Sequence, residues 1–108
     1  MWIFTPQGFI SAVAHREDPQ SIMIRARDQG HLRAMFPGST VVKSPLGDYP
    51  ARISIPRNVF AAWLASQAYD LDYTNFKDAI PYEDRTYHDA CVAVWEDMHA
   101  LETEDGRD

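Results

Sequence analysis

The stretch SIMIRAR, at residues 21–27, indicates the fold class because its apolar and polar side chains alternate. Successive side chains of a β-strand point to opposite faces of a sheet. The apolar side chains at even positions, such as Ile22 and Ile24, would therefore face a core. Arg25 and Arg27 would share the opposite face, so the stretch predicts one strand of a half-exposed sheet.

Residues 49–55 show the same alternation, with Ile53 and Ile55 on the apolar side and Arg52 on the polar side. Two strands of this kind favour an antiparallel sheet that is covered on one face and solvated on the other. Arg52 would then lie on the same open face as Arg25, and that face would be basic.

The remaining chain predicts further strands at residues 2–5, 9–15 and 40–43, the first two joined as a hairpin through Pro6-Gln7-Gly8. A helix is expected at residues 29–36, after the N-cap Asp28, and a second helix from Pro56 onward. A single turn follows at residues 75–77, and a long last helix is expected from Pro81 to about Glu102. The order β-β-β-α-β-β-α-α predicts an α+β fold. Its antiparallel sheet has about five strands, starts with a hairpin and carries helices mainly on one face.

Two apolar stripes at helical spacing indicate which helix faces meet a core. The first stripe consists of Val59, Phe60, Trp63 and Leu64. The second consists of Tyr87, Cys91, Val94, Met98 and Leu101, and Trp95 widens it. We therefore expect Trp63 and Trp95 in the core and Cys91 as a buried, unreactive thiol.

Length and composition predict one globular domain at residues 1–102, followed by a short, acidic, flexible tail at residues 103–108. The chain has 108 residues, of which 45% are hydrophobic and 24% charged. One cysteine cannot form an internal disulfide, and the longest apolar run, residues 59–65, is too short to cross a bilayer. No signal peptide is recognisable, so we expect a cytoplasmic protein without a membrane partner.

The net charge of −6 is unevenly distributed along the chain. Residues 1–82 hold eight Lys/Arg and seven Asp/Glu, which gives +1, and residues 83–108 hold two and nine, which gives −7. General attraction to nucleic acid or to anionic lipid is therefore not expected. A local basic patch in the first part remains open.

The usual signatures of catalysis and of cofactor binding are missing from the sequence. The four histidines do not form a zinc-ligand pattern, and the five glycines do not form a phosphate-binding loop. Cys91 lies within an apolar stripe, and no Gly-x-Ser-x-Gly motif occurs. We therefore assign no catalytic residue, metal or cofactor.

The sequence resembles a group of small uncharacterised bacterial and phage proteins. The similar motifs are Met1-Trp2-Ile3-Phe4-Thr5-x-x-Gly8-Phe9-Ile10-Ser11, Arg25-Ala26-Arg27 with His31-Leu32, Asp72-Tyr73-x-Asn75-Phe76-Lys77, and Val94-Trp95-x-x-Met98. The resemblance covers most of the chain and implies a single domain of bacterial or phage origin, with no activity attached to it. Where the group leads us to expect histidine, this chain has Val92, which weakens any histidine-based mechanism.

The candidate binding residues are cationic, aromatic and polar side chains: Arg25, Arg27, Arg52, His31, Tyr73, Asn75 and Lys77. The first interpretation is a non-enzymatic protein-binding or regulatory module. The alternative is a small enzyme that holds a phosphorylated or nucleic-acid substrate with the arginines and transfers a proton through His15 or His31. A third, weaker interpretation is a nucleic-acid binder without chemistry.

The arginine row needs solvent or acidic groups around it, because adjacent like charges repel. The acidic groups could be internal, with Glu96, Asp97 and Glu102 of the last helix lying across the sheet. They could also be external, on the acidic helix of a second copy or on another protein. The alternative interpretation is that the basic face is an ordinary solvated surface.

Overall fold

The computed structural model describes residues 1–44 and 47–104 of the chain. The described residues divide into two compact units, at residues 1–73 and 74–104, and each unit is described by itself. The α+β class and the predicted order of strands and helices are both confirmed. The single domain at residues 1–102 stays a prediction.

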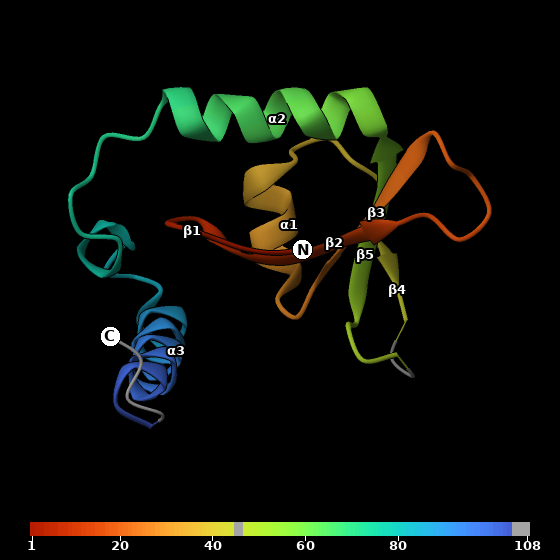
Figure 1. Ribbon diagram of the computed structural model, residues 1–108. Helices are drawn as coiled ribbons and strands as arrows, with labels where there is room; N and C mark the ends of the chain where they lie inside the picture. Colours follow the sequence, from red (N-terminus) through yellow and green to blue (C-terminus); the bar gives the residue numbers. More distant parts are fainter. Residues whose placement is uncertain (45–46, 105–108) are drawn as a thin grey trace. The chain divides into compact units, whose positions relative to one another are not determined.

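The first unit consists of a five-stranded antiparallel sheet and two helices (Figure 1). Its elements are β1 (Trp2–Thr5), β2 (Gly8–Ala14), β3 (Ser21–Ala26), α1 (Gln29–Met35), β4 (Val42–Lys43), β5 (Ala51–Pro56) and α2 (Arg57–Tyr69). The strands lie in the order β1-β2-β3-β5-β4. The fourth strand is shorter than the predicted residues 40–43.

The β1–β2 hairpin turns through two residues, where a three-residue connection was predicted. Thr5 pairs with Gly8, so Gly8 is the first residue of β2. The Thr5 hydroxyl accepts a hydrogen bond from the Gln7 N–H (3.1 Å) and donates one to the Gly8 carbonyl (3.2 Å). Gly8 has a φ of 154° and lies against the His31 ring, which leaves no room for a side chain at this position.

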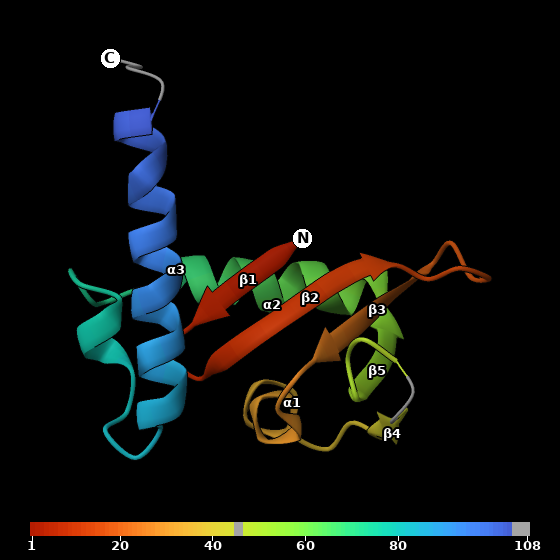
Figure 2. The ribbon, with the colours of Figure 1, turned by 90° about the horizontal axis from the view of Figure 1, so that it is seen from below.

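Both helices of this unit cover one face of the sheet. The core between the sheet and the two helices consists of buried side chains from all of these elements: Ile10, Ala12, Ile22, Ile24, Ala26, Leu32, Met35, Phe36, Ala51, Ile53, Ile55 and Phe60. Asp28 caps α1 as predicted, because its carboxylate accepts from the Gly30 N–H at 2.8 Å. Figure 2 views the sheet from the side away from α2.

Helix α2 buries a narrower stripe than the sequence predicts. Phe60 is buried, and Trp63 packs against the core with its ring 4.7 Å from that of Phe36. The prediction that Val59 faces the core is wrong, since this side chain is 49% exposed. Phe60, Trp63 and Leu64 follow the i, i+3, i+4 spacing of one helix face, and Val59 lies about 100° away from Phe60.

The second unit consists of a 3-10 turn, η1 (Lys77–Ala79), and the long helix α3 (Arg85–Glu104). A single turn was predicted at residues 75–77, and the observed turn begins two residues later, at Lys77. Asn75 precedes the turn, and its side-chain oxygen accepts a hydrogen bond from the Asp78 N–H. The helix begins four residues after Pro81 because the Asp84 carboxylate accepts from the Tyr87 N–H, as an N-cap does. It extends to Glu104, and the rest of the predicted tail lies outside the described residues.

Cys91 is buried as predicted, but the expectation that Trp95 lies in the core is wrong. Trp95 is 54% exposed, with Lys77 Nζ 4.8 Å from its ring centre and the His99 ring stacked at 5.6 Å. A helix of 20 residues is about 30 Å long. Within this unit, the three-residue turn η1 is too short to cover a helix of that length.

Candidate binding site on the open face of the sheet

Five residues form one continuous row across the face of the sheet opposite to α1 and α2, which we call the open face. Strand register pairs Trp2 with Ser11, Ser11 with Arg25, Arg25 with Arg52, and Arg52 with Val42. All five strands contribute one member. Neighbouring strands lie about 4.8 Å apart, so this cross-sheet row is about 19 Å long. Because successive residues alternate between faces, the row faces away from the core.

Arg25 lies at the centre of the cross-sheet row and has two partners. Its Nη2 donates a hydrogen bond to the Ser11 hydroxyl at 2.9 Å, and Ser11 is only 1% exposed. Its guanidinium carbon lies 4.6 Å from the centre of the buried Tyr49 ring, in a cation–π contact. These contacts hold the side chain flat against the sheet.

Arg52 is directly opposite Arg25 on the neighbouring strand, with the two Cα atoms about 4.5–5.5 Å apart. Its guanidinium lies against the backbone of Gly47, where a Cβ would come within 2.8 Å of Nη2. A glycine at position 47 therefore lets this loop approach the guanidinium closely.

The Arg25 and Arg52 side chains share one unusual feature, which is an unsatisfied Nε–H. Both Nε atoms are buried and have no hydrogen-bond partner among the described residues. Neither guanidinium pairs with a carboxylate in that part of the chain, although the two like charges are adjacent. A buried donor without a partner costs about 1–3 kcal/mol, and more when it is charged. The pair therefore has donors and charge that an anion would match.

Arg27 shares the Tyr49 ring with Arg25, but it already has an anionic partner. Its guanidinium carbon is also 4.6 Å from the Tyr49 ring centre. It donates to the Asp48 carbonyl at 3.1 Å and lies 3.5 Å from the Asp48 carboxylate. The structure thus brings Arg25 and Arg27 together on the Tyr49 ring and places Arg52 beside Arg25 on the next strand. Arg25 and Arg52 have no carboxylate partner among the described residues.

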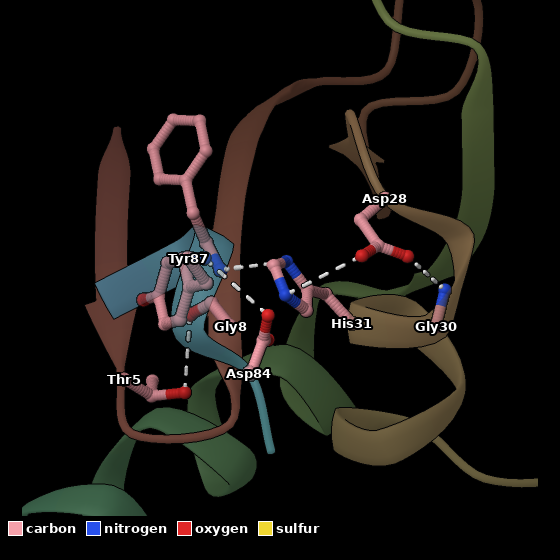
Figure 3. A network of polar contacts seen from close by, with 8 residues as sticks. Thr5, Gly8, Asp28, Gly30, His31, Asp84 and Tyr87 are labelled. Atoms are coloured by element: carbon pink, nitrogen blue, oxygen red, sulfur yellow. Dashed lines mark hydrogen bonds and ion pairs between the residues drawn. The ribbon is translucent and has the colours of Figure 1, made fainter. Parts of the chain in front are cut away.

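His31 lies on α1, which packs on the covered face of the sheet, and so it does not join the arginines. Its Nδ1 accepts a hydrogen bond from the Phe9 N–H at 3.3 Å, and its Nε2 is 3.7 Å from the Asp28 carboxylate. Figure 3 shows the ring between Gly8 and Asp28. These contacts give His31 a place in the packing of α1 against the hairpin.

His15 is engaged in the loop after β2, where its Nδ1 accepts from the N–H groups of Glu17 and Asp18 at 3.1 Å. The neighbouring Asp18 carboxylate accepts from the Ser21 hydroxyl and from the Gln20 N–H, which lowers its pKa. Both histidines considered for proton transfer are therefore built into local structure.

The other three candidate residues lie elsewhere. Tyr73 lines a hollow of about 570 Å³ beside β1 and the end of α2, together with side chains such as Ile3, Leu64 and Leu71. In the second unit, Asn75 accepts from the backbone of the 3-10 turn, and Lys77 lies over Trp95. Asn75 and Lys77 thus have local structural contacts of their own.

Sequence reasoning missed three members of the site: Trp2, Ser11 and Tyr49. Trp2 is 66% exposed and touches Phe9 edge-on at 6.0 Å, while Phe4 stacks on Phe9 at 4.7 Å. Alternation along β1 and β2 places Trp2 and Ser11 on the open face, but only the strand register puts them in line with Arg25. Tyr49 precedes β5, and the alternation of residues 49–55 would have placed it on the apolar side with Ile53 instead of beside Arg25.

No family model matches this chain, and no curated protein or solved structure matches it either. The resemblance to bacterial and phage proteins accordingly stays a prediction. In the part of the chain that the structure describes, every helix is too short or too polar to span a lipid bilayer. Within the same residues, no three or more His, Cys, Asp or Glu side chains are grouped in a way that could hold a metal ion.

Proposed function

We propose that the chain is a non-enzymatic binding module whose open face binds an acidic segment of a protein. The observation that carries this proposal is the adjacent pair of Arg25 and Arg52, whose guanidinium groups have no carboxylate partner among the described residues. A guanidinium presents its N–H donors in a planar fork that matches a carboxylate with two parallel hydrogen bonds. A carboxylate beside this pair would accept from the terminal N–H groups and would offset the repulsion between the two arginines.

The remainder of the cross-sheet row favours a protein segment as the ligand. The exposed Trp2 lies two strands away from Arg25, about 10 Å, and aromatic side chains are frequent anchors of protein interfaces. The chain as a whole is acidic and has no general attraction to nucleic acid, so the site depends on the local arginine pair. A short acidic segment with an apolar side chain suits both the arginine pair and Trp2.

The test is titration of the full chain with a hexaglutamate peptide, followed by calorimetry or by Trp fluorescence. Arg25→Gln and Arg52→Gln should each raise the dissociation constant at least tenfold. Arg16→Gln, which removes the same charge from an exposed loop, should change it less than twofold. Binding should weaken as salt rises, because exposed charges are screened over about 8 Å at 0.15 M.

Two results would count against this function. One is that the chain fails to bind hexaglutamate at low salt. The other is that Arg16→Gln weakens binding as much as Arg52→Gln, which would show that binding depends on net charge and not on the arginine pair. Circular dichroism of each variant shows whether it remains folded.

A further inference from the structure

The second half of α3 presents an apolar strip without a cover. Tyr87 and Cys91, in the first half of the helix, are buried, but Met98 and Leu101 continue the same stripe and are 57% and 50% exposed. Large apolar side chains that are exposed along one helix face are typical of a surface that another chain covers.

Acidic residues flank this strip on both sides. Successive residues of a helix are about 100° apart, so Asp97 lies about 40° from Leu101 on one side and Glu102 about 40° from Met98 on the other. Glu102 also contacts His99, with 2.6 Å between its Oε2 and the ring Nδ1. The strip is therefore apolar along its centre and acidic along its edges, which we call the acidic–apolar strip.

The two units of the chain have opposite charge. Residues 1–73 hold seven Lys/Arg and six Asp/Glu, a net +1, whereas residues 74–108 hold three and ten, a net −7. Two α3 helices would repel each other through their acidic edges if they paired with one another. The open face instead provides arginines for those edges and the exposed Trp2 for the apolar centre.

We propose that the acidic–apolar strip of α3 binds the cross-sheet row of a second copy of the chain. This inference rests on the proposed function and names the partner. The strip rises about 8 Å along the helix axis from Asp97 to Glu102, which is close to the distance of about 10 Å between Trp2 and Arg25 in the row. Because each copy carries both surfaces, the contact can form twice around a two-fold axis, which closes the assembly as a dimer.

The test is the mass of the full chain in solution, measured by light scattering and sedimentation over a range of protein concentrations. At low salt the 12.3 kDa chain should run at twice that mass. Arg25→Glu with Arg52→Glu, and separately Asp97→Lys with Glu102→Lys, should each raise the dimer dissociation constant at least tenfold.

A mixture of these two double variants tests whether complementary charge reversals restore the dimer. In the mixed pair, the glutamates on one sheet meet the lysines on the other helix, and the second contact keeps its natural residues. An equimolar mixture should therefore dimerise although neither variant does so alone. The control is Asp89→Lys with Glu96→Lys, which makes the same charge change on another side of α3 and also removes one histidine contact, that between Asp89 and His88. This control should remain a dimer.

The outcomes separate this inference from the proposed function. A wild-type chain that stays monomeric but binds hexaglutamate through Arg25 and Arg52 overturns the second copy as partner and leaves the binding function standing. A control variant that dissociates as fully as the Asp97/Glu102 variant, or a mixture that fails to dimerise, also overturns the inference. A monomeric chain that does not bind hexaglutamate overturns both.

Discussion

Replacing Arg52 by methionine should stabilise the folded chain by about 1 kcal/mol. The arginine has a buried Nε–H without a partner among the described residues, which costs about 1–3 kcal/mol, and a like charge directly opposite, which costs a few tenths more. Methionine keeps an unbranched apolar stem of similar length, so the packing along β5 is retained. Loss of arginine solvation elsewhere on the side chain offsets part of the gain.

Urea denaturation of the wild type and of Arg52→Met measures this difference. The midpoint should rise with an unchanged slope, and Tm should rise by about 4 °C or more. Hexaglutamate binding should be lost in the same variant, since a binding site commonly carries a stability penalty. A variant destabilised by more than about 1 kcal/mol would refute the reasoning, because Arg52 would then have a stabilising partner.

Arg25→Met is the matched comparison, and its effect should have the opposite sign. This substitution removes the cation–π contact with Tyr49 and leaves the buried Ser11 hydroxyl without its donor. The cation–π contact contributes about 0.5–1 kcal/mol and the orphaned hydroxyl costs about 1–3 kcal/mol, which together exceed the net gain of about 1 kcal/mol expected for Arg52→Met. If both arginine variants changed stability equally, net charge and not geometry would control the effect.

Three further predictions concern packing and titration. Trp63→Ala should destabilise the chain by about 3 kcal/mol in denaturant, because its ring packs on the core, whereas Trp95→Ala should cost less than about 1 kcal/mol; equal losses would contradict this contrast. Gly8→Ala should destabilise the chain by more than about 2 kcal/mol, because a Cβ at position 8 would collide with the His31 ring. Adding His31→Ala should restore part of this stability. If it restores none, the loss comes from backbone strain at the positive φ and not from the collision. Burial raises the pKa of the Cys91 thiol, so its stabilising contribution is complete below the unfolded-state pKa and is lost as pH rises through the folded-state pKa. Cys91→Ala should therefore lose less stability than the wild type between about pH 7 and pH 10, and parallel losses would show that the thiol is not responsible.

The strands and the arginine cluster could be predicted from the sequence because period-2 alternation is a local signal. Residues 21–27 place Arg25 and Arg27 on one side of a strand without any tertiary information. That Arg25 faces Arg52, and that Ser11 and Trp2 continue the row, depends on strand register. Register is set by long-range packing of the apolar face, and the sequence alone does not give it.

The errors arise where helical spacing was taken as evidence of burial. Trp95 and Met98 fit the apolar stripe of α3, but a stripe shows only which side could be covered. It does not show whether the chain supplies a cover of sufficient length. Val59 fails for a related reason, since α2 rests on the sheet along one narrow line that follows Phe60 and Leu64.

The most direct test of the binding site is NMR observation of the Arg25 and Arg52 Nε–H groups during titration with hexaglutamate. The account predicts that both resonances shift in proportion to peptide bound, reach saturation together and yield the affinity measured by calorimetry. The Arg16 Nε–H should keep its position under the same conditions. Peptide binding that leaves the Arg25 and Arg52 resonances unchanged would contradict the assignment of the ligand to the open face.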